Sequence, residues 1–434
     1  MKNFYEEYKQ KLASADDILS MIRSGDVINC GGSGIEPQLM LSRLHELRGR
    51  VENITCMVAL GVTDYPFMTQ PEYADTFRVP TNFMQTAGRR AHSLGIAEFL
   101  PADLDNGCSF WQERHPSDWC FIQSTPMNER GEFSISLSLL RELEAVEGSK
   151  KVVLEVNPNV PWINGEGVVK LSQVDYILEA SNPLPVVPSA KAGPVEQEIA
   201  KNIASLIRDG DTIQFGIGSI PDATAALLMD RRDLGIHTEL FTNSMRDLIE
   251  AGVVTNRRKT LDTGLTVATF AMGMPETYKM LAERNDVFMR RGHYVNSPFV
   301  IAQQENFVSV NNALAVDLGG QVCSESIGPR MYSGTGGQFD TAYGAFHSKG
   351  GRGIIALRAT ADTKQGRIST VNAMLAPGSV VSLSRNYVDY IVTEYGIAHL
   401  RGLTVRERAK ELIRIAHPDY RAELARDAEK FMLW

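Results

Sequence analysis

Short apolar runs alternate with longer amphipathic stretches along the chain. The clearest runs, at residues 151–154 and 353–356, are rich in β-branched residues. In the stretch before residue 208, Ile199, Ile203 and Ile207 recur at the spacing of one helix face. Helices that alternate with short strands favour an α/β fold with mainly parallel sheets. In such sheets, ligands bind at the carboxyl ends of the strands.

The predicted elements occur twice in the same order. Residues 22–35 and 207–220 each contain the end of an amphipathic helix, a Gly-Asp turn, a short apolar run and a turn rich in small residues. One such match could arise by chance, but three matches in one order indicate an internal repeat. The two further matches are residues 131–134 with 366–369, which are predicted to be hairpin-like, and residues 174–177 with 388–391.

A proline-rich segment at residues 182–188 separates the two copies. Proline fixes φ and removes a backbone donor, so this segment suits an extended linker. We therefore predict two similar, duplicated α/β domains, residues 1–185 and 190–434. The cleft between two such domains is the expected place for an active site.

The composition argues against several classes of protein: nucleic-acid-binding, metal-binding, secreted and membrane-spanning proteins. With 434 residues, 43% apolar, the chain can bury a large core, and its net charge of −8 argues against a nucleic-acid partner. The five cysteines are scattered and form no C-x-x-C pair, so neither a metal site nor a redox motif is predicted. From the polar start of the chain we expect no signal peptide, and no apolar run reaches the length of a membrane span. We expect a cytoplasmic protein without a membrane partner.

The turn after the apolar run that ends at Phe215 carries candidate chemistry. It reads Gly216-Ile217-Gly218-Ser219-Ile220-Pro221, and Pro221 can open a helix at its first position. Such a turn presents backbone N–H groups to a phosphate or an oxyanion. Glu239 follows at a distance that also fits, loosely, the acidic residue of a dinucleotide fingerprint. Against that alternative, proline stands where the fingerprint requires its third glycine.

Glu239 lies in the run Gly235–Phe241, which is too apolar for a plain surface strand. A carboxylate is unusual in such an apolar run, which indicates a specific role. His237 stands two residues before Glu239, so both side chains can face the same side of a strand. Three glycines within four residues, in the segment 334–337, indicate either a flexible turn or a close approach of the backbone to a ligand.

Together these motifs resemble the acetyl-CoA hydrolase/transferase family, in its 4-hydroxybutyrate CoA-transferase and butyryl-CoA:acetate CoA-transferase branch. The resemblance runs through nearly the whole chain and includes the duplicated halves. It rests on the turn from Gln214 to Pro221, the run to Glu239, Ser333-Gly334-Thr335-Gly336-Gly337-Gln338, the segment 392–400 and the segment 416–420.

The resemblance implies a role for each matching residue. Glu239 matches the catalytic glutamate, and Asn296 and Gly337 match positions that contact the thioester oxygen or CoA. The chain departs from close relatives at Asn243-Ser244 and at Ser297, which leaves the acid specificity open. Matches to CoA-binding positions are Gln214, Phe215, Gly216, Ile217, Gly218, Asn312, Ser333 and again Gly337.

The implied reaction moves CoA between a short-chain acyl-CoA and a free acid such as acetate, butyrate or 4-hydroxybutyrate. It follows a ping-pong course through a glutamyl-CoA thioester, with CoA as substrate and covalent intermediate and no permanently bound cofactor. A homo-oligomer, dimer or tetramer, is expected. The alternatives are transfer to a dicarboxylate such as succinate or itaconate, acyl-CoA hydrolysis, a nicotinamide-dependent oxidoreductase and a non-catalytic CoA-binding protein. For a dicarboxylate, Arg246, Arg89 and Arg90 are the candidate cations.

Overall fold

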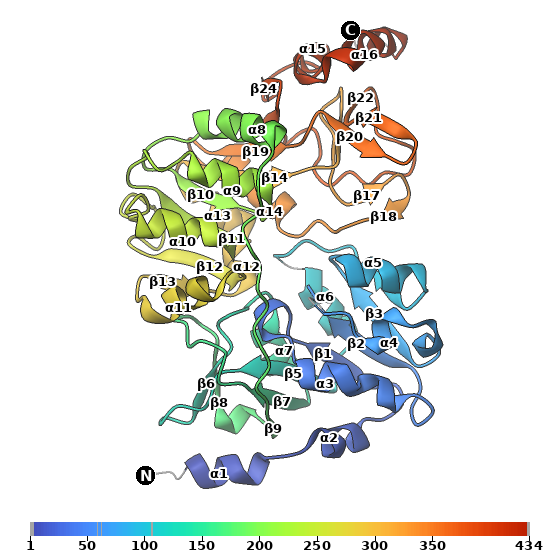
Figure 1. Cartoon of the computed structure of the whole chain (residues 1–434), viewed down its shortest axis with the longest axis vertical. Coiled ribbons are helices and arrows are strands. Elements are labelled where there is room, and N and C mark those ends of the chain that lie inside the picture. Colours follow the sequence, from blue (N-terminus) through green and yellow to red (C-terminus); the bar gives the residue numbers. More distant parts are fainter. Residues whose placement is uncertain (1–3, 59, 62, 106, 432–434) are drawn as a thin grey trace. The chain divides into compact units, whose positions relative to one another are not determined.

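The computed structural model describes residues 4–431, apart from residues 59, 62 and 106 (Figure 1). The chain forms two compact units. The first contains residues up to 187 together with 268–293, and the second contains residues 188–267 and those from 294 onward. The assignment of domains to residues 1–185 and 190–434 stays a prediction.

The first unit is built on a seven-stranded sheet in the order β4-β3-β2-β1-β5-β7-β9, in which every neighbouring pair is parallel. Its strands are β1 (Val27–Cys30), β2 (Ile54–Val58), β3 (Phe77–Thr81), β4 (Ala97–Phe99), β5 (Trp119–Ser124), β7 (Lys151–Val156) and β9 (Tyr176–Glu179), with the small strands β6 (Glu132–Ser134) and β8 (Val168–Lys170) beside it. Its helices are α1 (Phe4–Lys11), α2 (Ala15–Met21), α3 (Gln38–Arg43), α4 (Pro66–Thr69), α5 (Thr86–Ser93), α6 (Gly107–Arg114), α7 (Glu142–Gly148) and α11 (Pro275–Glu283). Strands β12 (Thr266–Ala271) and β13 (Val287–Met289) lie wholly or mostly in its second segment.

The second unit repeats this plan. Its strands follow the order β11-β10-β14-β19-β23-β24, and all pairs are parallel except the last. These strands are β10 (Thr212–Phe215), β11 (Gly235–Phe241), β14 (Phe307–Asn312), β19 (Arg352–Ala356), β23 (Tyr390–Thr393) and β24 (Gly396–His399). The main helices are α8 (Pro194–Ser205), α9 (Ser219–Ala226), α10 (Asn243–Glu250), α13 (Pro298–Ile301), α14 (Gln338–His347), α15 (Val405–Ile415) and α16 (Pro418–Lys430), and α12 (Gly292–Val295) spans the boundary of the units. Short strands complete the unit: β15 (Ala315–Asp317), β16 (Val322–Cys323), β17 (Ser326–Ile327), β18 (Arg330–Met331), β20 (Thr360–Thr363), β21 (Gly366–Ser369) and β22 (Val371–Asn372).

The two sheets confirm the predicted fold class and the internal repeat. The order β2-β1-β5-β7-β9 in the first unit corresponds to β11-β10-β14-β19-β23 in the second. The predicted runs at 151–154 and 353–356 form β7 and β19, which hold equivalent places in the two orders. Each unit has its own apolar core, which includes Ile28 and Phe121 in the first and Val316 and Ile391 in the second.

The repeated Gly-Asp turn has one structural cause in both copies. Gly25 and Gly210 have φ values of +83° and +80°, a left-handed conformation that glycine adopts without strain. The carboxylate of the following aspartate then accepts a hydrogen bond from a backbone N–H three residues earlier, at 3.0 Å for Asp26 and 2.6 Å for Asp211. This turn delivers the chain into β1 and β10.

The two small repeated segments are hairpin-like in both units. Residues 366–369 form a hairpin with the neighbouring strand β20. At residues 131–134 the chain turns back on itself, since the N–H of Asn128 donates to the Glu132 carbonyl and the N–H of Thr125 donates to the Ser134 carbonyl. Strand β6 also pairs antiparallel with β8, more than thirty residues later. Local sequence fixes the turn that starts at Asn128, but the pairing partner is chosen by the tertiary fold.

The structure also tests what the composition indicated about membrane spans and cysteines. Within the described ranges, no helix is both long and apolar enough to cross a bilayer. Cys30, Cys56, Cys120 and Cys323 are buried and unbridged, and the side chain of Cys108 lies outside the described part of the chain.

Candidate active site

The glycine turn connects β10 to α9 at the carboxyl edge of the second sheet. Gly218 has a φ of +121°, so a residue with a Cβ is strained there, whereas a Cβ at Gly216 meets nothing within 4 Å. Ile217 is 50% exposed, and Gln214 and Phe215, at the end of the strand, are buried. The turn therefore leaves open space above the start of a helix, where backbone N–H groups can receive an anion.

The predicted position of Pro221 is off by two residues. Helix α9 begins at Ser219, with Gly218 as its N-cap, so Pro221 is its third residue and not its first. Proline is tolerated there because the N–H groups of the first helical turn need no partner within the helix.

Glu239 is half-buried on β11, while the rest of that strand is buried. The Asn296 amide nitrogen donates to Glu239 Oε2 at 3.2 Å, and the backbone N–H of Gly337 donates to the same carboxylate. Burial raises the pKa of Glu239 above its ordinary value, and the hydrogen bonds from Asn296 and Gly337 oppose that shift. Asn296 itself is fully buried, so its side chain is held in place by packing.

Only glycine fits at position 337. A Cβ added there would stand 2.1 Å from both Glu239 Oε2 and Asn296 Nδ2. Gly337 is also the N-cap of α14, so the positive end of a ten-residue helix lies at the carboxylate. The structure thus brings together three of the predicted site residues, Glu239, Asn296 and Gly337, which come from three segments far apart in sequence.

His237, two residues before Glu239, supports the site and does not contact the carboxylate in any hydrogen bond described. It is buried, and its Nε2 lies 2.8 Å from the carbonyl oxygen of Val295. Its ring also meets the edge of Phe307, with centroids 6.0 Å apart. Since Val295 precedes Asn296, this contact fixes the backbone that carries the amide donor.

The other predicted residues lie on neighbouring turns. Asn312 ends β14 with an exposed side chain, and its carbonyl accepts a hydrogen bond of 2.7 Å from Gln338. The backbone N–H of Ser333 donates to the Glu325 carbonyl at 2.9 Å. Their roles in binding CoA, and that of residues 214–218, stay predictions.

Sequence reasoning missed a buried polar cluster beneath these turns. Ser309 and Asn311 on β14 and Thr341 on α14 lie within hydrogen-bond distance of one another, and Ser309 also lies within reach of Gln214, at 2.8–3.2 Å. Ser309 and Asn311 are polar residues at alternate positions of a buried strand, and Thr341 lies one helical turn after Gly337. That alternation is the signal that could have found them.

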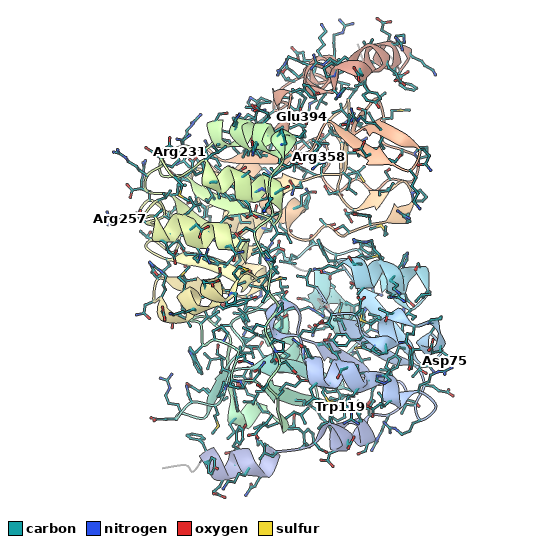
Figure 2. The ribbon with its side chains drawn as sticks, in the orientation of Figure 1. Asp75, Trp119, Arg231, Arg257, Arg358 and Glu394 are labelled. Carbon is teal, nitrogen blue, oxygen red and sulfur yellow. The ribbon has the colours of Figure 1, made fainter. Side chains whose placement is uncertain are left out.

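Two of the three arginines considered for a second carboxylate have other partners. Arg246 pairs with Asp247 at 2.7 Å, and Arg89, which lies in α5 with Arg90, donates to the Met84 carbonyl at 3.1 Å. Arg231, labelled in Figure 2, donates to backbone carbonyls of Ala204 and Ile207.

The residues where the chain departs from its predicted relatives make local contacts. The Asn243 side chain donates to Ser189 Oγ at 3.3 Å, and the hydroxyls of Thr242 and Ser244 are 3.0 Å apart. Ser297 is the N-cap of α13, directly after Asn296. Within the described residues, no group of three or more His, Cys, Asp and Glu side chains is arranged to hold a metal.

Comparison with known proteins identifies the family to which this fold belongs. The family model of the acetyl-CoA hydrolase/transferase N-terminal domain matches residues 1–188, and the model of the C-terminal domain matches residues 273–428. The 4-hydroxybutyrate coenzyme A transferase of Clostridium kluyveri is 40% identical over 98% of this chain and 99% of its own length. The succinyl-CoA:cyclohexane-1-carboxylate CoA transferase of Geobacter metallireducens is 40% identical over 99% of this chain and 97% of its own length.

Solved structures agree. RipA from Yersinia pestis superimposes with a TM-score of 0.93 at 34% identity, over the whole of both chains. The 4-hydroxybutyrate CoA-transferase of Porphyromonas gingivalis does so with a TM-score of 0.82 at 33% identity, over 99% of this chain and all of its own. Fold and relatives define a CoA-transferase. The chain belongs to the acetyl-CoA hydrolase/transferase family.

The close approach at Gly337 yields a first prediction. In Gly337→Ala the added methyl must displace the ends of the Glu239 and Asn296 side chains. We expect CoA-transfer activity to fall about 10²-fold or more, as for other losses of oxyanion donors or of alignment, in a protein that remains folded by circular dichroism. Gly148→Ala is the matched control, because a Cβ there meets nothing within 4 Å. Normal activity in Gly337→Ala would show that the working enzyme does not depend on this contact.

The second prediction concerns pH. A nucleophilic Glu239 must be ionised, so kcat/KM should fall as pH drops through its raised pKa. Asn296→Ala removes a hydrogen bond that lowers this pKa, so the acid limb of the profile should move to higher pH, by about one unit for a bond of roughly 1.4 kcal/mol. Asn202→Ala, which also loses an amide hydrogen bond within the second unit, should leave the limb in place. A profile that does not move in Asn296→Ala contradicts the assignment.

Proposed function

We propose that this CoA-transferase exchanges CoA between a short-chain acyl-CoA and a free monocarboxylic acid, with Glu239 as the nucleophile. One observation carries the proposal: the Glu239 carboxylate is half-buried and is held by two donors, the Asn296 amide and the Gly337 N–H. A carboxylate with a purely structural role at that position would need only one hydrogen-bond or ion-pair partner. This carboxylate instead meets the backbone of Gly337 so closely that only glycine fits there.

The reaction itself requires a carboxylate. A transferase exchanges a thioester for a carboxylate with little change in free energy, so the nucleophile must form both an anhydride and a thioester. Glu239 Oε attacks the carbonyl of the acyl-CoA, the C–S bond breaks and CoA leaves as the thiolate. The product is a mixed anhydride between Glu239 and the acyl group.

The CoA thiolate then attacks the Glu239 carbonyl carbon. The anhydride C–O bond breaks, the first acid leaves as its carboxylate, and a glutamyl-CoA thioester remains. The second acid attacks this thioester, and the same two steps in reverse order release the new acyl-CoA and regenerate the Glu239 carboxylate. No proton is gained or lost in the cycle.

Each attack creates a tetrahedral oxyanion next to Glu239. The Asn296 amide and the Gly337 N–H are already oriented toward the carboxylate, so they stabilise the developing charge without reorganisation. The backbone of Gly216–Gly218 supplies the predicted second set of donors. The raised pKa of Glu239 also suits the role, since a poorly solvated carboxylate is a stronger nucleophile than one in bulk water.

A monocarboxylate is the preferred acid. Acids with a second carboxylate are usually held by arginine, yet two of the three candidate arginines are engaged: Arg246 pairs with Asp247, and Arg89 bonds a backbone carbonyl. Relatives named for monocarboxylates include the Clostridium kluyveri enzyme and the butyryl-CoA:acetate CoA-transferase of Anaerostipes caccae, 33% identical over the whole chain. The name of the Geobacter metallireducens relative supports succinyl-CoA as a second candidate donor. Homo-oligomeric assembly and a cytoplasmic location stay predictions.

A screen of acceptors tests the choice of acid. With acetyl-CoA as donor, butyrate and 4-hydroxybutyrate should each yield the new acyl-CoA by mass spectrometry, and succinate should yield much less. The total thioester, followed by its ultraviolet absorbance, should stay constant, because a transferase conserves it. A clear preference for succinate overturns the monocarboxylate assignment, and loss of thioester without an acceptor identifies a hydrolase instead.

A further inference from the structure

We infer that Thr341, Ser309 and Asn311 form a hydrogen-bonded relay that positions Gly337 against Glu239 and orients the Gln214 side chain. The relay joins two turns that are predicted to bind CoA, one after β10 and one before α14. The inference rests on the proposed role of Glu239 and adds three positioning residues to it. None of the three is placed in contact with the reacting atoms.

Thr341 fixes the carbonyl side of Gly337, opposite the N–H that faces Glu239. Its hydroxyl donates to the Gly337 carbonyl at 2.9 Å, and its backbone N–H donates to the same oxygen at 2.9 Å. The side chain is 2% exposed, so water does not compete for this contact. Two bonds to one carbonyl fix the rotation of the Gly337 residue, whose N–H on the other side points at Glu239.

The hydroxyl protons of the relay can be assigned by counting donors. The Asn311 amide nitrogen has two N–H groups and donates to Ser309 Oγ at 2.8 Å and Thr341 Oγ1 at 3.0 Å. Thr341 gives its own proton to the Gly337 carbonyl. Ser309 lies 2.9 Å from Thr341 Oγ1 and 3.2 Å from Gln214 Oε1.

We assign the single Ser309 proton to Gln214. Thr341 Oγ1 already accepts a bond from Asn311, whereas Gln214 Oε1 is a buried acceptor that would lose its described partner without Ser309. Gln214 and Ser309 are also register partners on the parallel strands β10 and β14, so their side chains share one face. With Oε1 engaged, the Gln214 amide nitrogen makes no other hydrogen bond among those described for residues 4–431, and its N–H groups can turn to a ligand.

The relay therefore has two separable functions. Thr341 orients the Gly337 N–H, which stabilises the transition state. Ser309 orients the Gln214 amide, which contributes to the binding of CoA. Because displacements of about 1 Å at a reacting centre can cost about 10²-fold in rate, small relaxations at either end should be measurable.

Variants of Thr341 test the first end. Thr341→Val keeps the shape and removes the hydroxyl, so kcat and the single-turnover rate of CoA loading should fall at least about tenfold, with a smaller change in KM. Thr341→Ser restores the hydroxyl and should recover most of the rate. The matched control is Thr69→Val, which loses a hydroxyl-to-carbonyl bond of the same 2.9 Å length at a buried helical site in the first unit. It should match Thr341→Val in any loss of stability and keep the wild-type loading rate.

Ser309→Ala tests the second end and covers the case in which Thr341→Val fails to fold. It should raise KM for acyl-CoA about tenfold and change kcat less. Wild type and Glu239→Ala are measured in parallel. If wild type does not load CoA, or Glu239→Ala loads it, the nucleophile is wrong. If both behave as proposed and yet Thr341→Val loads at the wild-type rate, or Ser309→Ala leaves KM unchanged, the relay is wrong.

Discussion

The contact of the Gly337 backbone with the Glu239 carboxylate is the constraint on which the site depends. There is no room for a Cβ, since it would stand 2.1 Å from the carboxylate and from the Asn296 amide. The contact requires β11, the turn before α13 and the start of α14 to meet at one point. Parallel strands make such a meeting natural, because their carboxyl ends share one edge of the sheet.

This arrangement has an energetic cost that points to function. Burial raises the pKa of Glu239, so the ionised carboxylate is less stable in the folded protein than in water, and only part of that loss is offset by Asn296 and Gly337. Protonation relieves the cost, so this group favours the folded state at a pH below its ordinary pKa, and the contribution is lost as pH rises through the raised pKa. A fold that needed only stability would place an apolar residue or a fully paired carboxylate at this position on β11.

The sequence allowed the fold to be predicted because the signals are local and occur twice. The Gly-Asp turn and the alternating strands are visible within about fifteen residues of each other, and Gly25 and Gly210 explain why the turn is repeated. Glu239, Asn296 and Gly337 could be selected as a set only through the family resemblance, since their contacts join three distant segments. The start of α9 was predicted wrongly, and the pairing of β6 with β8 could not be predicted from the local pattern, because the tertiary fold decides both. The relay was out of reach for a related reason: Ser309 and Gln214 are 95 residues apart, and Thr341 has the appearance of an ordinary helical threonine until its Gly337 partner is known. Sequence patterns record which face of a strand a residue occupies, but they do not record which buried hydroxyl lies opposite.

Locating the covalent intermediate tests the role of Glu239 without relying on kinetics. The enzyme is incubated with acyl-CoA and no acceptor acid, treated with borohydride, digested and mapped by mass spectrometry. If Glu239 is the nucleophile, the thioester-bearing side chain, reduced to an alcohol, is found at Glu239. Modification of any other residue, or an unmodified Glu239 in an enzyme that transfers CoA normally, would contradict that role.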